Sequence, residues 1–214
     1  MRNFEGIIFD IDGTLTSTNE LIFESFKYVA NKYFKKSPTD EEIISLFGPP
    51  EDVILKAWSG DQYDTVRNDY YNFYTVNHHM ADLYPGIKEI LDFIKGKNIP
   101  LAIFTGKGRT AAYITLNELS IFNYFDLIVT GDDVKKHKPS AEGIIKFLTE
   151  FNLAPEKVLM IGDSPSDIKA SRDAGVKIAS VVWDSYAKDK VLELGSDYVF
   201  NKVSELKEFL ENNL

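Results

Sequence analysis

The sequence contains no cysteine, no long apolar run and no excess of basic residues. Without cysteine, the protein has no disulfide, no thiolate metal site and no cysteine nucleophile. No segment approaches the roughly 18 consecutive apolar residues of a membrane-spanning helix. The first residues also lack the small-residue cleavage site of a signal peptide. We therefore expect a cytoplasmic protein that does not bind membranes.

Acidic residues outnumber basic ones, 33 to 24, and the formal net charge is −9. Proteins that bind a nucleic-acid backbone need a positive surface, so we expect no nucleic-acid partner. Hydrophobic residues make up 44% of the 214 residues, which is ordinary for a globular chain with a substantial core. This length fits one domain, or a core domain with a smaller inserted one, and is compatible with a monomer or a homodimer.

Six short apolar runs are spread along the chain, and each suits a strand that is buried on both faces. Helical patterns of apolar residues lie between several of them, at 86–95, 140–151 and 166–174. Strands that alternate with helices predict an α/β fold with a doubly wound, Rossmann-like parallel sheet. The six predicted strands cover residues 6–11, 100–105, 125–130, 158–163, 178–183 and 197–200.

The segment from 17 to 82 interrupts this alternation because it contains no convincing strand. Its apolar residues recur at helical spacing over 20–33, and its last part, 61–79, is polar and rich in tyrosine. We therefore predict an all-helical cap domain at 17–82, inserted into an α/β core formed by 1–16 and 83–214.

Two aspartates, Asp10 and Asp12, lie at the C-terminal end of the first predicted strand, and Gly13 then lets the chain turn sharply. Strand alternation sends both carboxylates to the same side, at the sheet edge where open parallel sheets bind ligands. Carboxylates this close need a cation or a shared proton to relieve their repulsion. The pair therefore offers a nucleophile and an acid/base group beside Mg²⁺, although a turn acid followed by a helix cap is the simpler alternative.

Two more polar groups follow later strands. Thr105 and Gly106 offer a hydroxyl and backbone amides to an anion at a helix N-terminus, or else form a plain strand-to-helix loop. Lys138 either neutralises a phosphoryl group or lies in a solvated basic loop. Pro139 comes directly after it, and we expect a helix to start there with Ser140 as its N-cap.

Asp163 lies at the tip of another predicted strand, and Asp167 follows one helical turn later. Both carboxylates can face one cation, as a ligand and as a supporting partner. A Gly-Asp turn followed by a helix cap explains either acid alone, but not the placement of both. Because all four groups follow parallel strands, we expect them to converge at one edge of the sheet.

Taken in order, these motifs resemble those of the haloacid dehalogenase-like phosphatase superfamily, and the resemblance covers essentially the whole chain. It implies that Asp10 attacks phosphorus and becomes an aspartyl phosphate. It implies that Asp12 protonates the leaving group and later activates water, and that Thr14 braces the turn that positions Asp12. The Mg²⁺ ligands would be Asp10, Asp12 through its backbone carbonyl, and Asp163.

The same resemblance assigns the phosphate-binding groups. Thr105, the Gly106 amide and Lys138 would hold the phosphoryl oxygens, and Asp167 would orient the site. Phosphoglycolate phosphatases often carry asparagine where this chain has Gly106, but glycine keeps the backbone donor.

The helical insertion resembles the cap of the subfamily that includes phosphoglycolate phosphatases, pyrophosphatases and β-phosphoglucomutase. We therefore expect an enzyme that hydrolyses the phosphate monoester of a small phosphorylated metabolite. A pyrophosphatase or a phosphosugar mutase on the same scaffold is the alternative, and a non-catalytic phosphoacceptor module is a remote one. A dehalogenase or a phosphonatase would not need an acid at Asp12.

The cap residues give weaker indications. In capped relatives, a loop such as 46–51 faces the active site and selects the leaving group, although its Gly-Pro-Pro sequence also suits a simple turn. If Glu51 pointed inward, it would disfavour anionic leaving groups. We expect His78 and His79 at the surface rather than on a metal, and we expect the tyrosines at 70, 71 and 74 to be packing residues.

Overall fold

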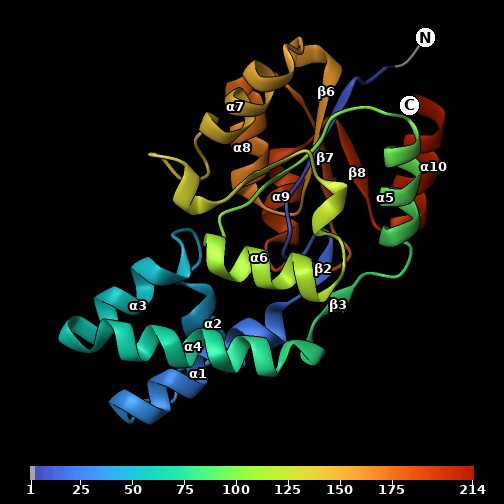
Figure 1. The fold of residues 1–214 in the computed structure, drawn as a ribbon. Helices are drawn as coiled ribbons and strands as arrows, with labels where there is room; N and C mark the ends of the chain where they lie inside the picture. The colour runs from blue at the N-terminus through green and yellow to red at the C-terminus, as the bar shows by residue number, and fades with distance from the viewer. Residues whose placement is uncertain (1–2) are drawn as a thin grey trace.

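The computed structural model describes residues 3–214 and contains a six-stranded parallel sheet with helices on both faces (Figure 1). The strand order is β5–β4–β1–β6–β7–β8, so the chain winds outward from β1 in both directions. This confirms the doubly wound α/β fold, and every strand of this sheet overlaps one of the six predicted runs. The strands are β1 Gly6–Phe9, β4 Leu101–Phe104, β5 Leu127–Val129, β6 Val158–Gly162, β7 Lys177–Val181 and β8 Tyr198–Phe200.

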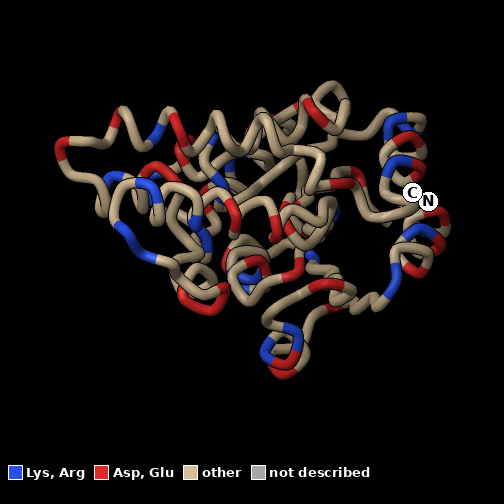
Figure 2. Tube along the Cα trace, turned by 90° about the horizontal axis from the view of Figure 1, so that it is seen from below, with Lys and Arg blue, Asp and Glu red and all other residues tan. Residues whose placement is uncertain are grey.

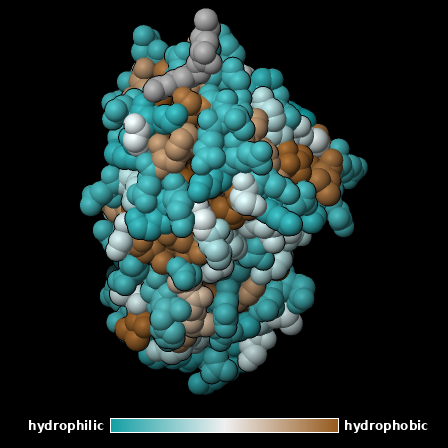
Figure 3. Space-filling view, turned by 90° about the vertical axis from the view of Figure 1, so that its right-hand side faces the viewer, coloured by the Kyte–Doolittle hydropathy of each residue, from teal (hydrophilic) through white to brown (hydrophobic). Residues whose placement is uncertain are grey.

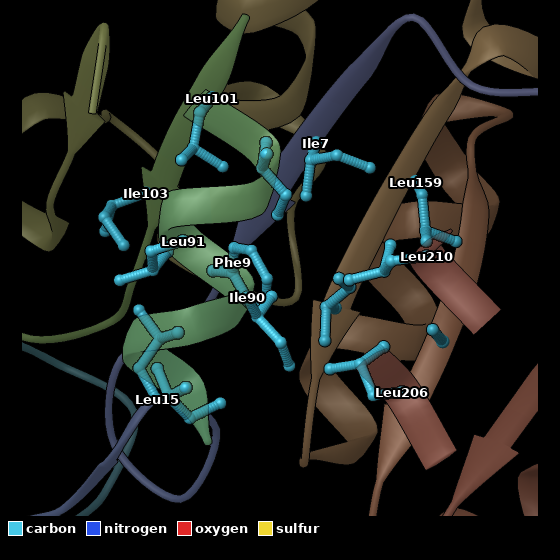
Figure 4. Packing of buried hydrophobic residues seen from close by; sticks show 14 of the residues in the cluster. Ile7, Phe9, Leu15, Ile90, Leu91, Leu101, Ile103, Leu159, Leu206 and Leu210 are labelled. Carbon is cyan, nitrogen blue, oxygen red and sulfur yellow. The ribbon is translucent and has the colours of Figure 1, made fainter. Parts of the chain in front are cut away.

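Alternate residues of the central strands face opposite sides of the sheet. Ile7 and Phe9 pack beneath α5 and α10, which lie side by side in Figure 1, and Figure 4 shows their apolar side chains meeting over the strands. Ile8 belongs to the opposite face, beneath α7, α8 and α9. Burial on both faces explains the unbroken apolar sequences of these strands. The core helices are α5 Ile87–Gly96, α6 Arg109–Glu118, α7 Glu142–Phe151, α8 Pro165–Ala174, α9 Lys188–Leu194 and α10 Val203–Asn213.

Four helices between β1 and α5 pack against one another and form a helical cap (Figure 1). Their shared core contains Phe26, Tyr70, Tyr71 and Tyr74, and it extends to Ala111 on α6. The inserted helical cap and the packing role of the three tyrosines are therefore confirmed. The cap helices are α1 Asn19–Phe34, α2 Asp40–Ile44, α3 Glu51–Ser59 and α4 Tyr63–Val76, and short 3₁₀ helices span η1 Gly60–Gln62, η2 His78–Met80, η3 Phe122–Tyr124, η4 Gly131–Asp133 and η5 Pro155–Lys157.

The chain enters and leaves the cap through two short strands, β2 (Thr16–Ser17) and β3 (Asp82–Leu83). They pair antiparallel, with Thr16 opposite Leu83 and Ser17 opposite Asp82. The sequence predicted no strand here because two-residue strands leave no periodic pattern. The cap is thus joined to the sheet by two adjacent, hydrogen-bonded segments.

The expected start of the helix after Lys138 is wrong. Helix α7 begins at Glu142 rather than at Pro139, and Ser140 is not its N-cap. The Glu142 carboxylate accepts hydrogen bonds from the amides of Lys135 and Lys136, at 2.9 and 3.0 Å. These bonds close the preceding residues into a compact loop, so the helix starts later than Pro139 suggested.

His78 is also placed differently from expectation, because it is buried and only 5% exposed. Its Nε2 lies 3.3 Å from Oγ1 of Thr115 on α6, and the Tyr74 hydroxyl lies 2.7 Å from the same oxygen. Burial lowers the pKa of His78. This side chain therefore joins the cap to the core, whereas His79 is exposed as expected.

None of the helices within residues 3–214 is long and apolar enough to cross a membrane. Figure 2 shows Lys and Arg interspersed with Asp and Glu along the trace. On the face drawn in Figure 3, hydrophobic residues form separate patches among hydrophilic ones. The acidic surplus is thus mixed with basic residues along the chain.

Candidate active site

The polar groups predicted from the sequence meet at one edge of the sheet. The neighbouring strands β4, β1 and β6 all end there, so the loops that follow them lie close together. A cavity of about 510 Å³ opens between this edge and the cap. Its lining includes every predicted catalytic, phosphate-binding and metal-binding residue: Asp10, Asp12, Thr105, Gly106, Lys138 and Asp163.

Lys138 forms buried ion pairs with two carboxylates. Its Nζ lies 3.1 Å from Oδ1 of Asp10 and donates to Oδ1 of Asp167 at 2.6 Å. Burial opposes the charged form of Lys138, but the charges of Asp10 and Asp167 outweigh it and raise its pKa. Lys138 is therefore a buried cation beside Asp10, not a solvated loop residue.

Asp163 lies beside Asp10, and the Thr14 hydroxyl donates to its Oδ1 at 3.3 Å. Oxygens of Asp10, Asp163 and Asp167 all lie within 4.8 Å of one another. Burial raises the pKa of Asp163 well above its usual range, and the charge of Asp10 raises it further. Burial likewise raises the pKa of Asp10 to about 6, against the opposing charge of Lys138. The site thus crowds negative charge where solvent does not relieve it.

This crowded set of carboxylates fits a divalent cation. Asp167 is already engaged, because Oδ1 accepts from the buried lysine and Oδ2 accepts from the Ser164 amide and hydroxyl. Asp10 and Asp163 are the remaining hard oxygen donors, and a bound Mg²⁺ would offset their repulsion. The side chain of Asp12 lies outside the cluster, which leaves its backbone carbonyl as the donor that the resemblance implies.

The turn after the first strand brings Gly13 and Thr14 against Asp163. Gly13 has φ +76°, a region that favours glycine, and a Cβ there would lie 2.5 Å from Oδ2 of Asp163. Thr14 is fully buried, and its amide donates to the Ile11 carbonyl at 3.2 Å. Thr14 therefore braces the turn and also links it to the loop after β6.

Asp12 is held by two residues that the sequence did not single out. Nζ of Lys107 donates to both of its carboxylate oxygens, at 3.1 and 3.0 Å, and the Thr18 hydroxyl donates to Oδ1. The Lys107 side chain is 1% exposed, and its Nζ also lies 3.5 Å from Oε1 of Glu51. The available signal was the position of Lys107, two residues after Thr105, where a lysine also fits a plain loop.

Thr105 and Gly106 form the segment that leads into α6. Thr105 is buried, and its Oγ1 accepts a hydrogen bond from the Lys107 amide at 3.2 Å. A Cβ on Gly106 would lie 3.4 Å from the carbonyl oxygen of Gly48. The cap loop therefore lies directly against this predicted anion-binding segment.

The side chain of Glu51 points inward, as considered above, and it contacts the N-terminal end of α6 in the core. Its Oε2 accepts a hydrogen bond from the Gly108 amide at 2.7 Å, where α6 begins and the helix dipole favours an acid. The approach requires small residues, because a Cβ on Gly108 would lie 2.9 Å from that oxygen. A Cβ on Gly131 would likewise lie 2.6 Å from Cγ of Pro50. Glu51 thus fastens the cap to the core.

The sheet topology and the acids gathered at its edge are those of a capped α/β hydrolase. The chain belongs to the haloacid dehalogenase-like hydrolase family, whose model matches residues 7–181. Pyrophosphatase PpaX of Anoxybacillus flavithermus is 32% identical over 209 residues, which is 97% of either chain. Pyrophosphatase PpaX of Bacillus pumilus is 31% identical over 204 residues, 94% of this chain and 93% of that one. The predicted family, and with it a phosphatase-type hydrolase, is confirmed.

Solved structures are similar over nearly the whole chain. One from Thermotoga maritima, provisionally named a β-phosphoglucomutase, is 31% identical with a TM-score of 0.78, over 99% of this chain and 100% of that one. A predicted phosphoglycolate phosphatase from Haemophilus somnus has a TM-score of 0.84 at 22% identity, over 98% and 99%. The second likeness shows the fold alone. The names of these relatives span three activities, which a shared fold does not separate.

Proposed function

We propose that this protein is a Mg²⁺-dependent phosphatase that hydrolyses a small-molecule phosphate monoester through a phosphoryl group on Asp10. The observation that carries this proposal is the position of Asp10, which lines the cavity beside the buried cation Lys138 and the acid Asp163. A phosphate in that cavity would meet a nucleophilic carboxylate and a fixed positive charge together.

In the proposed reaction, a carboxylate oxygen of Asp10 attacks phosphorus as the bond to the leaving oxygen breaks. Lys138 and the amides before α6 stabilise charge on the non-bridging oxygens. When bound by Asp10, Asp163 and the backbone carbonyl of Asp12, Mg²⁺ supplies charge that offsets repulsion between the carboxylate and the phosphate.

Asp12 would protonate the departing alcohol and then take a proton from the water that releases phosphate from Asp10. Proton transfer of this kind contributes about 10²- to 10⁴-fold to the rate. Lys107 and Thr18 support this role, because they fix the Asp12 carboxylate at the cap side of the cavity.

Lys107→Met should lower kcat about 10- to 100-fold, because Asp12 would lose the group that positions it. It should also lower the free energy of unfolding by about 3 kcal/mol, because the Glu51 carboxylate would stay buried without its cation. Steady-state kinetics and urea denaturation measure both effects. Lys169→Met is the matched control, since Lys169 is an exposed lysine of α8 that pairs with Asp173. An unchanged kcat in Lys107→Met would contradict the positioning role.

Pyrophosphate hydrolysis is the second candidate, because the curated relatives with 32% and 31% identity are named pyrophosphatases. A phosphosugar mutase is the third, from the name of the Thermotoga structure. All three would use the same attack by Asp10, and they differ in the leaving group that the cap receives.

A hydrolysis screen with Mg²⁺ over phosphosugars, phosphoglycolate, nucleotides and pyrophosphate tests the proposed function. We expect multiple turnovers of inorganic phosphate from at least one monoester, loss of at least about 100-fold of that rate with EDTA, and recovery with Mg²⁺. Labelling by acetyl phosphate without turnover would instead indicate a phosphoacceptor module. Isomerisation without phosphate release would indicate a mutase.

We also propose that the cap domain spans 17–82 and the catalytic core 1–16 and 83–214. The antiparallel pairing of Ser17 with Asp82 supports these limits, since it ties together the two ends of the insertion. We further propose a cytoplasmic enzyme, a monomer or a homodimer, with no nucleic-acid or membrane partner. The net charge of −9 supports the absence of a nucleic-acid partner.

A further inference from the structure

Apolar side chains make up most of the cavity wall on the side of the cap, beside the polar cap residues Asn19 and Glu51. These apolar side chains come from α1, from α2 and the loop after it, from α3, and from the segment before α9. A cavity of about 510 Å³ is typical of sites for ligands larger than pyrophosphate. Pyrophosphate would leave most of this volume unfilled. The large apolar side chains in this wall are Ile22, Phe26, Ile44, Phe47, Ile54 and Tyr186.

Two of these aromatic rings are accessible. Phe47 is 43% exposed and Tyr186 is 57% exposed, although both line the cavity. Each packs on Phe23, with ring centroids 6.2 Å apart for Phe47 and 5.9 Å apart for Tyr186. Phe23 thus holds both rings at the cavity while leaving their surfaces available to a ligand.

Among the residues that the structure describes, the cavity lining offers no free cation that could bind an anionic leaving group. Within residues 3–214, its lining has four carboxylates and two lysines, and neither lysine belongs to the cap helices. Lys138, beside Asp10, is the cation that would bind the reacting phosphate itself, and Lys107 is paired with two carboxylates, Asp12 and Glu51. A second phosphate or a carboxylate on the substrate would therefore enter a region with no uncommitted cation in the described part of the chain.

We propose that the natural leaving group is an uncharged, apolar alcohol, preferably an aromatic one. This inference rests on the proposed phosphatase function and specifies its substrate class. The phosphate binds at Asp10 and Lys138, and the alcohol portion lies against Phe47 and Tyr186. Pyrophosphate, phosphoglycolate and other substrates with a second negative charge are excluded as preferred substrates by the same wall.

The test compares alkyl phosphates whose alcohols differ in apolar surface and charge. We expect kcat/KM for 2-phenylethyl phosphate to exceed that for glycerol 3-phosphate by about 10- to 100-fold, the effect of burying one aromatic ring. Phosphoglycolate and pyrophosphate should be slower still. Acetyl phosphate, with its small leaving group, reports whether the wild-type enzyme has phosphatase activity at all.

Variants of Phe47 test the wall itself. Phe47→Ala should lower the preference for 2-phenylethyl phosphate over glycerol 3-phosphate by about 10-fold. Phe47→Lys should raise kcat/KM for phosphoglycolate, because it adds a cation to the part of the cavity lining that comes from the cap, where the described residues supply none. Val53→Ala is the matched control: Val53 is 51% exposed on α3 and is not part of the cavity lining, so the substrate preference should not change.

The outcomes separate the two proposals. If acetyl phosphate is hydrolysed but pyrophosphate or phosphoglycolate is preferred to 2-phenylethyl phosphate, the apolar leaving group is wrong and the phosphatase stands. Equal kcat/KM for 2-phenylethyl phosphate and glycerol 3-phosphate would also overturn the proposed apolar leaving group. If no phosphate ester is turned over with Mg²⁺, the proposed function fails and the substrate class fails with it.

Discussion

Asp10→Asn should abolish steady-state hydrolysis of every phosphate ester, with a loss of at least about 10⁴-fold, because an amide cannot form the phosphoryl intermediate. The substitution keeps the size of the side chain, so the fold should persist. It also removes the repulsion between the carboxylates of residues 10 and 163, and this relief opposes any loss of stability. Phosphate release and thermal unfolding, followed on the same preparation, measure the two effects.

Asp173→Asn is the matched control for this experiment. Asp173 is an exposed aspartate on α8 that pairs with Lys169, and it is not one of the residues that line the cavity. Its activity should equal that of the parent protein. Turnover by Asp10→Asn at the parent rate would rule out Asp10 as the nucleophile, whatever the geometry of the site.

Asp12→Ala should have the second largest effect, a loss of about 10²- to 10⁴-fold for alkyl phosphates. The loss should be smaller for p-nitrophenyl phosphate, because p-nitrophenolate departs without needing a proton. The dependence of kcat on leaving group, measured over a series of aryl and alkyl esters, should therefore be steeper in the variant than in the parent.

Asp12→Asn separates acid chemistry from support of the site. Asparagine can still accept the hydrogen bonds from Thr18 and Lys107 but cannot transfer the proton. We expect it to be as impaired as Asp12→Ala on alkyl phosphates. Equal losses on aryl and alkyl esters, or recovery of activity with asparagine, would argue against the acid role.

The fold class and the residues at the strand ends could be predicted from the sequence. Buried parallel strands have apolar sequences, and Asp10, Thr105 and Asp163 lie at the C-terminal ends of three such runs, so they could be placed at one edge of the sheet. The strand order that puts β4 and β6 on either side of β1 could not be read, because it depends on long-range packing.

Contacts between residues far apart in the sequence, within the core and between cap and core, could not be predicted for the same reason. Lys107 meets Asp12 across 95 positions of sequence, and Gly108 meets Glu51 across 57. Neither pair has a local pattern, and a lysine in a loop or an acid at a helix start has simpler explanations. The burial of His78 could not be predicted either, because its partner, Thr115, lies on a core helix 37 residues away.

The paired strands β2 and β3 bear on how such an enzyme changes its substrate. Because Ser17 and Asp82 are neighbours across one ladder, the inserted segment leaves and rejoins the sheet at a single place. Its helices can lengthen, shorten or be exchanged while the register of all six parallel strands stays the same. Selection for a new alcohol can thus act on one module while the phosphate-handling residues stay fixed. A graft between relatives at 17 and 82 would transfer the donor's share of the cavity wall, including the position of Phe47, but not that of Tyr186.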